Sequence, residues 1–305
     1  MLFRSPPGLR ADRYVYYSGI GLFMLAGLGG AALVRKITGP GVFRNVVLMV
    51  LTGTIGVAAA WATTIRNRVW ESSYTLFTDS LAKNPTNSLA HHNLGAYLKD
   101  HDARGVFVRE GGQLDLAGEH FTAAITIDPN HADAHGDLAS VRIAQKRFAE
   151  ALPLARRAVE LKEGSAINHF IYGNALLGTG RLDQAAEEYA KAVALDRSFT
   201  DAYNNLTIAL YRLKRHEDLK HALEAFSEAD PGNWRAFNNL AWLLATCPQS
   251  AVRDGGRALT LARQAGQMPG SDAVDTLSTL AAALAETGRF DEAVATQRQI
   301  GRAHV

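Results

Sequence analysis

Asparagine side chains recur at matching places along this chain, and amides are groups that can hold a peptide. An amide both donates and accepts hydrogen bonds, so a row of amides can bind an extended backbone whatever its side chains are. The alternative is a structural role, in which the same amides bond neighbouring turns of the chain. The residues concerned are Asn93, Asn205 and Asn239, with Asn204 and Asn238 beside two of them.

The row is incomplete, because Asp137 and Ile171 stand where two further asparagines would complete it. Other residues fall by position on the same predicted helix faces and are candidates for the same surface. These are His92, Lys99, Asn174, Tyr211, Arg212, Arg235 and Trp242. Within this set, Lys99 and Arg212 carry the positive charge that an acidic ligand terminus needs.

Metal binding and catalysis are not predicted. The ten histidines include His131 and His135, four residues apart, but His131 falls in a turn, which argues against a shared helix face. His91, His135 and His169 occupy one repeat position where a large packing residue is expected. The sequence has no HExxH motif and no cysteine cluster, and its only GLGG lies in an apolar segment. We therefore predict no catalytic residue, no metal and no cofactor.

Charge is distributed unevenly along the chain. Residues 1–70 hold eight cations against a single acid, Asp12, for a net charge of +7, whereas the whole chain carries +2. The remainder is therefore mildly acidic, which argues against nucleic acid as a partner, while the basic, apolar N-terminal part suits a membrane surface. The lone Cys247 excludes a disulfide within the chain.

Two segments of 21 residues, 14–34 and 45–65, contain no charged side chain. A helix of that length extends about 31 Å, close to the hydrocarbon thickness of a bilayer. We predict two transmembrane helices joined by the basic loop 35–44, so that residues 1–69 form a membrane region. The positive-inside rule favours a cytoplasmic loop and extracytoplasmic chain ends. The alternative is a pair of buried helices in a soluble protein.

Residues beyond the apolar segments repeat with a period of 34, most regularly in the blocks 132–165, 166–199 and 200–233. Each block is predicted to contain two amphipathic helices, with small residues where the second helix lies against the first. The aligned residues are Leu138, Tyr172 and Leu206 at position 7, Ala151, Ala185 and Leu219 at position 20, and Ala158, Ala192 and Phe226 at position 27.

The stretch GNALLGTGRLDQAAEEYAKAVALD, residues 173–196, and the Asp-Pro ends of two blocks resemble the tetratricopeptide repeat (TPR). The resemblance implies an all-α fold, a right-handed α-solenoid whose first helices line a concave groove. Two blocks with extra residues between their helices, 88–131 and 234–265, and a sixth from Val274 extend the array to about six repeats over residues 88–299. Residues 70–87 resemble a connecting half-repeat.

Most of the chain resembles the C-terminal part of bacterial relatives of the transmembrane-and-TPR protein O-mannosyltransferases, which are GT-C glycosyltransferases. The resemblance comprises the apolar hairpin, the junction RNRVWESSYTLFTDSLAKNPTNSLAHHNLGAYL and the repeats. In that class catalysis depends on acidic residues of early extracytoplasmic loops and on a polyprenyl-phosphate sugar donor, and no position here matches those loops. The solenoid of O-linked N-acetylglucosamine transferase uses a similar asparagine ladder, a resemblance that favours peptide contact for the amides.

Both ends of the chain match translations of a common sequencing adapter, MLFRS at residues 1–5 and IGRAHV at residues 300–305. We therefore predict that the chain is a fragment of a longer gene and that residues 300–305 are an adapter-derived tail.

Three functions are consistent with these features. The first is a membrane-anchored TPR scaffold that binds protein or peptide partners in its groove and contacts membrane lipid through residues 14–65. It would lie in a bacterial inner membrane with the TPR domain extracytoplasmic. The second is the acceptor-binding part of a polytopic GT-C protein glycosyltransferase, and the third is a scaffold for secretion or envelope-polysaccharide machinery. The fragment itself is predicted to be non-catalytic.

Overall fold

The computed structural model describes residues 42–70, 72–101 and 112–303. The first predicted membrane segment, 14–34, and most of the insertion in the 88–131 block lie outside these residues, as does the end of the 300–305 tail. Within the described residues the chain forms two compact units, one ending at Lys83 and one starting at Asn84.

The described residues form 14 α-helices and no strand, which confirms the predicted all-α fold class. The first unit contains α2 (Val42–Arg68) and α3 (Ser73–Lys83). The second unit contains α4 (Ser88–Asp100), α5 (Leu114–Ile127), α6 (Ala132–Ala144), α7 (Phe148–Leu161), α8 (Ala166–Gly178), α9 (Leu182–Leu195), α10 (Thr200–Arg212), α11 (His216–Ala229), α12 (Trp234–Thr246), α13 (Gly255–Gln267), α14 (Ala273–Glu286) and α15 (Phe290–Ala303).

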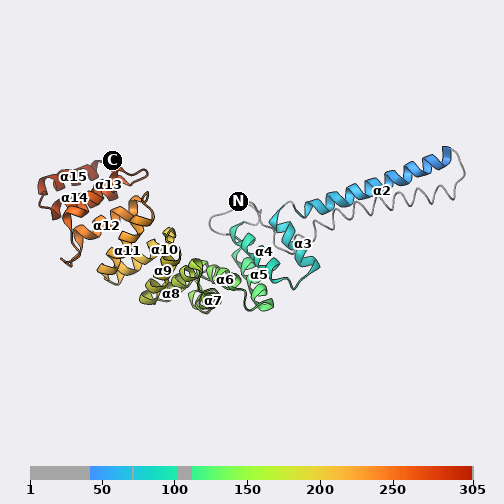
Figure 1. Ribbon diagram of the computed structural model, residues 1–305, viewed down its shortest axis with the longest axis horizontal. Coiled ribbons are helices and arrows are strands. Elements are labelled where there is room, and N and C mark those ends of the chain that lie inside the picture. The colour runs from blue at the N-terminus through green and yellow to red at the C-terminus, as the bar shows by residue number, and fades with distance from the viewer. Residues whose placement is uncertain (1–41, 71, 102–111, 304–305) are drawn as a thin grey trace. The chain divides into compact units, whose positions relative to one another are not determined.

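The helix α2 is continuous over 27 residues and contains the second predicted membrane segment, 45–65 (Figure 1). Several large apolar side chains along it are exposed, among them Met49 at 75%, Val57 at 72% and Trp61 at 69%. No helix in the described part of the chain, α2 included, combines the length and hydropathy needed to cross a membrane. The helical conformation predicted for 45–65 is confirmed, and the membrane span predicted there is not supported by this result.

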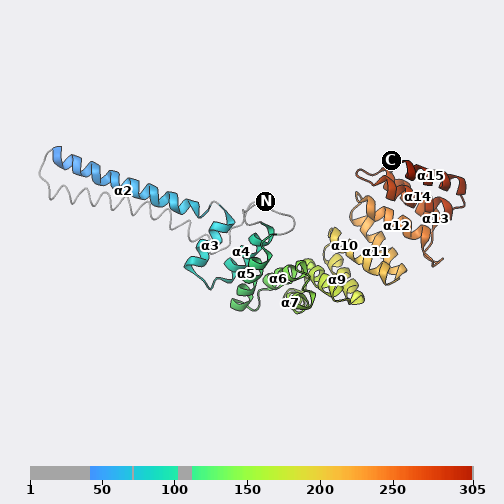
Figure 2. The same cartoon turned by 180° about the vertical axis from the view of Figure 1, so that it is seen from behind.

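The second unit is a succession of antiparallel helix pairs, α4 with α5 through α14 with α15, and each pair packs against the next. Figures 1 and 2 show the pairs following one another along the chain from α4 to α15. The buried cores are shared between neighbours: one cluster includes Leu176 of α8, Leu206 of α10, Leu240 of α12 and Ala283 of α14. Because every pair buries apolar surface only against its neighbours, the array has the packing of a solenoid.

Small residues at the predicted contact positions set the distance between the two helices of a pair. Ala185 and Ala192 on α9 are fully buried at 0% exposure, as are Ala151 and Ala158 on α7. Gly173 on α8 is required by close approach, since a Cβ atom there would lie 2.6 Å from Cε1 of Tyr189. Interhelical distance follows the size of the side chains at the contact, so these residues allow tight pairs.

The turn inside four repeats has one geometry. The second residue after the first helix, directly beyond its C-cap, adopts a positive φ, at Lys146 (61°), Gly180 (79°), Lys214 (57°) and Gly288 (78°). The N–H of the following arginine then donates to the carbonyl five residues earlier, over 2.8–3.0 Å, in the manner of a Schellman cap. This cap satisfies carbonyls at the end of the first helix and reverses the chain into the second.

The histidines at repeat position 4 also have a shared contact. Nε2–H of His91, His135 and His169 donates to the carbonyl oxygen six residues earlier, at 3.1, 3.0 and 2.9 Å. The acceptors are the carbonyls of Pro85, Pro129 and Glu163, which lie in the turns between repeats. These imidazoles therefore fix the entry of the chain into each first helix.

One pair is held further apart than the others. The helices α10 and α11 pack less closely than the helices of any other repeat. Their contact positions carry Leu219 and Phe226 where α7 and α9 have alanines, and the Phe226 ring stacks on Tyr203 with centroids 4.7 Å apart. Because these bulky side chains separate the helices, the array opens at this repeat.

Candidate functional site

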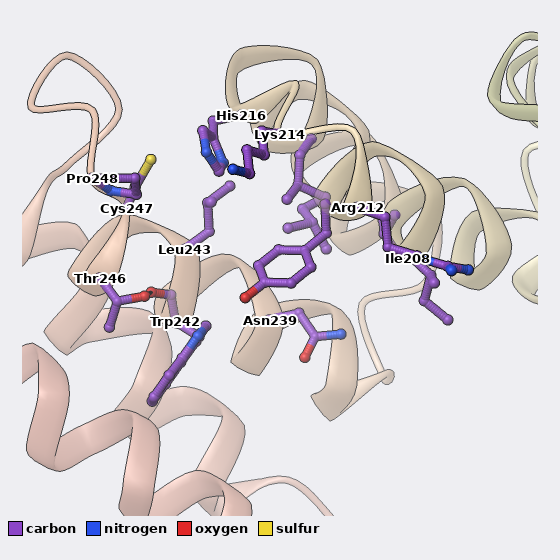
Figure 3. A pocket seen from close by; sticks show the side chains of 14 residues that line it. Ile208, Arg212, Lys214, His216, Asn239, Trp242, Leu243, Thr246, Cys247 and Pro248 are labelled. Carbon is purple, nitrogen blue, oxygen red and sulfur yellow. Dashed lines mark hydrogen bonds between the residues drawn. The ribbon is translucent and has the colours of Figure 1, made fainter. Parts of the chain in front are cut away.

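A pocket lies where the array opens, between α10, α11 and α12 (Figure 3). Its volume is about 630 Å³, within the usual range for ligand pockets. The lining residues are Thr207, Ile208, Tyr211, Arg212, Lys214, His216, Leu219, Leu223, Asn239, Trp242, Leu243, Thr246, Cys247 and Pro248.

The pocket has a leucine floor and an aromatic rim. Leu219, Leu223 and Leu243 are each 2–4% exposed and belong to the core of the solenoid. At the rim, Tyr211 is 60% exposed and Trp242 is 42% exposed. Large apolar groups held in water at the mouth of an apolar cavity are typical of a binding surface, because their burial by a ligand is favourable.

The packing of α10 explains why space remains here. Elsewhere in the array first helices lie against each other, as α6 does against α8 and α12 against α14. In contrast, α10 packs mainly on the second helices α9 and α11. The side that α10 presents toward α12 is therefore left for the pocket.

Positive charge without a partner lies beside the pocket. Arg212 ends α10 and Lys214 follows in the turn, and neither forms an ion pair within the described residues. The nearby acids are engaged elsewhere: Asp218 accepts from Arg215 at 2.7 Å, and Glu217 lies 3.9 Å from Lys220. No acidic residue lines the pocket.

A buried histidine also lines the pocket. His216 begins α11 and is only 9% exposed, and its Nδ1 has no hydrogen-bond partner among the described residues. An unpaired polar atom in a buried position costs free energy, so such atoms are rare in folded proteins. Figure 3 shows His216 beside Lys214 at the edge of the pocket.

Four of the residues predicted from sequence meet in this pocket: Tyr211, Arg212, Asn239 and Trp242. Asn239 is exposed, and its amide has no hydrogen-bond partner in the described part of the chain. Its donors and acceptor are therefore free for a ligand, next to an apolar surface that can hold a side chain.

Two other predicted amides bond each other. Asn205 donates from Nδ2 to Oδ1 of Asn174 at 2.9 Å, and the Tyr189 hydroxyl donates to the same oxygen at 2.7 Å. The bond connects α10 to α8 across 31 residues of sequence. Burial is the main cause that raises the pKa of Tyr189, so this hydroxyl stays a donor at neutral pH.

The remaining predicted residues do not reach the pocket. Asn93 and Asn204 are half-buried, whereas Asn238 is 7% exposed and its Oδ1 lacks a partner within the described residues. The guanidinium of Arg235 lies 4.6 Å from the ring centroid of Trp234, a cation–π contact.

His92 and Lys99 are bound to an acid of the next repeat. Lys99 Nζ lies 2.7 Å from Oδ1 of Asp137, and His92 Nε2 lies 2.9 Å from Oδ2. Burial alone would raise the pKa of Asp137, but the hydrogen bonds from His92 and Lys99 and the charge of Lys99 outweigh it, and the net shift is downward. The charge of Lys99 is therefore already neutralised.

The described residues contain no group of three or more histidine, cysteine, aspartate or glutamate side chains that could hold a metal ion. The histidine pair noted in the sequence has structural contacts instead. The Nδ1 of His131 accepts from the N–H of Ala134 as the N-cap of α6, and His135 bonds the Pro129 carbonyl.

Sequence reasoning missed Ile208, His216 and the leucine floor. Ile208 occupies repeat position 9, the same place as Asn174 and Trp242, so the repeat alignment could have identified it. The signal for the pocket itself was the replacement of alanine by Leu219 and Phe226 at the two contact positions.

The fold is that of a tetratricopeptide-repeat solenoid. Residues 173–214 match the family profile described as TPR repeat, and residues 109–167 match the one described as Tetratricopeptide repeat. The chain is also similar to Protein O-mannosyl-transferase TMTC3 of Homo sapiens, with 26% identity over 287 residues, covering 81% of this chain and 31% of the relative. It thus spans about a third of the length of that curated relative.

Solved structures show the same fold. The TPR protein YrrB, described as having an unusual peptide-binding site, is similar with a TM-score of 0.51 and 19% identity, over 66% of this chain and 95% of its own. PilF of Pseudomonas aeruginosa is similar with a TM-score of 0.51 and 22% identity, over 71% of this chain and 91% of its own.

Proposed function

We propose that the chain is a TPR scaffold that binds a peptide segment of a partner protein along its first helices, centred on the pocket between α10 and α12. The observation that carries the proposal is the meeting of a free amide, Asn239, with exposed aromatic side chains, Tyr211 and Trp242, over a leucine-lined cavity. Backbone hydrogen bonds to amides and burial of a side chain are the two interactions that peptide-binding grooves use.

The test is capture of peptides from a random-sequence display library by the immobilised full chain. We expect recovered peptides to bind the unaltered chain, and to bind the Asn239→Ala variant more weakly. The control is Asn130→Ala, which removes an exposed amide in the turn between α5 and α6, outside the pocket, where its Oδ1 accepts from Arg157 at 3.0 Å. Failure to recover any peptide would contradict the proposed function.

We propose as a second function that the solenoid presents acceptor protein to a glycosyltransferase region of a longer protein. The similarity to Protein O-mannosyl-transferase TMTC3 and the small share of that relative covered here support it. Fusing the chain to the N-terminal region of a protein O-mannosyl-transferase of this kind and measuring transfer of mannose to captured peptides tests it. Captured peptides that are never glycosylated would leave only the scaffold function.

We also propose that the first unit associates with lipid. The support is the row of exposed apolar side chains on α2, including Val50 at 60% and Val57 at 72%, within a segment that carries no charge. Flotation of the full chain with phosphatidylcholine vesicles is expected, and Val50→Glu with Val57→Glu should abolish it. Flotation that survives both changes would exclude α2 as the lipid-binding element.

A further inference from the structure

We propose that the pocket between α10, α11 and α12 selects a short acidic–apolar motif, in which a bulky apolar side chain enters the pocket and carboxylates on flanking residues pair with Arg212 on one side and Lys214 on the other (Figure 3). The proposal rests on the proposed function, since it names the class of peptide that the groove takes. It commits to one occupant, a segment of another protein.

The apolar half of the motif follows from the shape of the site. The floor is made of buried leucines, and Tyr211 and Trp242 stand at the mouth with about half of their surface in water. A side chain that enters removes apolar surface from water on both the floor and the rim, which favours leucine-sized or aromatic groups over small or polar ones. A cavity of about 630 Å³ has room for such a side chain and part of the adjoining backbone.

The acidic half of the motif follows from the charges. Arg212 and Lys214 have no ion-pair partner in the described residues, and no acid lines the pocket. Beside an apolar cavity a carboxylate is less screened than in bulk water, so its attraction to an unpaired guanidinium is stronger.

The first repeat provides an internal comparison. There Lys99, a cation predicted to face the groove, is paired with Asp137 at 2.7 Å, so the charge of Lys99 is not free for a ligand. The contrast places the acid-recognising part of the groove at α10 and the turn that follows it.

Lys146 supplies a matched control for Lys214. Both lysines follow a first helix, and both adopt the same positive φ, 61° and 57°. Only Lys214 lines the α10–α12 pocket. A charge reversal at either position therefore changes a lysine with the same backbone conformation, but only the change at Lys214 alters the lining of the pocket.

The experiment uses the full chain and the peptides recovered from the random display library. We expect enrichment of aspartate or glutamate within two residues of a leucine, isoleucine, phenylalanine or tryptophan. A fluorescein-labelled consensus peptide should lose about tenfold or more in affinity with Arg212→Glu, with Lys214→Glu and with Trp242→Ala, as expected of central contacts. Lys146→Glu should leave the affinity within about twofold, as should Leu195→Ala, which truncates an exposed leucine on α9.

Panning against the doubly reversed Arg212→Glu, Lys214→Glu chain gives the sharpest result. We expect the preferred flanking residue to change from acidic to lysine or arginine while the apolar residue is retained. Thermal melting of each variant establishes that it remains folded, and the exposed positions of Arg212, Lys214 and Trp242 favour this.

The outcomes separate the two proposals. Peptides that bind without an acidic–apolar preference, or whose affinity is unchanged by Arg212→Glu and Trp242→Ala, would overturn the motif and leave peptide binding intact. Recovery of no peptide would overturn both. Concentration-dependent dimers of the chain that disappear with Trp242→Ala would overturn the motif in favour of a second copy as occupant.

Discussion

Asn205 donates its side-chain amide to Oδ1 of Asn174 at 2.9 Å, and this bond joins the first helices of two consecutive repeats. The two residues were both candidates for peptide contact. Their mutual bond shows that an amide of the ladder can instead hold neighbouring repeats together, which was the structural alternative. Asn239, with no such partner in the described residues, is the contrasting case.

The first prediction separates these two roles. Asn205→Ala should lower the free energy of unfolding by about 1 kcal/mol, because one net hydrogen bond between repeats is lost. Asn239→Ala should leave that free energy within about 0.5 kcal/mol and reduce peptide capture. Urea unfolding and peptide binding are measured on both variants, and equal losses of stability would show that Asn239 also has a structural role.

The second prediction concerns the small contact between α8 and α9. Ala185 is fully buried, so Ala185→Leu should lower the free energy of unfolding by about 1–3 kcal/mol through overpacking. Ala190 lies on the same helix but is exposed, and Ala190→Leu serves as the control. A neutral result at Ala185 would refute the assigned contact between the helices of the pair.

The third prediction concerns the strained turn of the second described repeat. Lys146 holds a φ of 61°, a conformation that glycine adopts without steric cost, as Gly180 does at the equivalent position. Lys146→Gly should therefore raise the free energy of unfolding by about 0.5–1 kcal/mol, and Gly180→Ala should lower it by about 1 kcal/mol. Chemical denaturation of both variants checks the pair, and changes of the same sign would disprove the argument.

The fourth prediction is a pH dependence at the first repeat. Burial, followed by the charge of His91, lowers the pKa of His120 below 6.5, and the two rings approach to 3.0 Å between their Nδ1 atoms. The unfolded chain binds the proton more readily, so stability should be fully present above about pH 7 and should fall as the pH drops through 6.5 toward the lowered pKa.

Urea midpoints measured between pH 7.5 and 5 test this dependence. His120→Gln should reduce the slope over that interval, and the slope that remains includes the contribution of His131, whose pKa is also lowered by burial. An unchanged slope in the His120 variant would assign the pH dependence to other groups.

Much of the fold could be predicted from the sequence because its cause is local and repeated. Position 20 and position 27 alanines allow two helices to approach, and a residue with positive φ turns the chain between them, so the period of 34 leads directly to stacked pairs. For the same reason the position-4 histidines were predicted to be structural, and each contacts a turn carbonyl.

The site was less predictable because it depends on differences between repeats. The sequence indicated which residues lie on the predicted groove face of the first helices. It did not show that Asn205 donates its side-chain amide to Asn174, or that Lys99 is paired with Asp137. These pairings join residues about a repeat apart, and one sequence does not reveal which partner a long side chain chooses. The pocket lies beside the repeat in which Leu219 and Phe226 replace alanines, but the stacking of Phe226 on Tyr203 is a contact between helices that the sequence does not show.

The loose packing of α10 against α12 has a consequence for mechanics. A ligand in this gap touches two consecutive repeats at once, so bending of the array at that joint alters the fit. The bend between these two repeats and ligand binding in the pocket are then thermodynamically linked. Tension that straightens the bend weakens ligand binding, and a bound ligand opposes straightening by the same free energy.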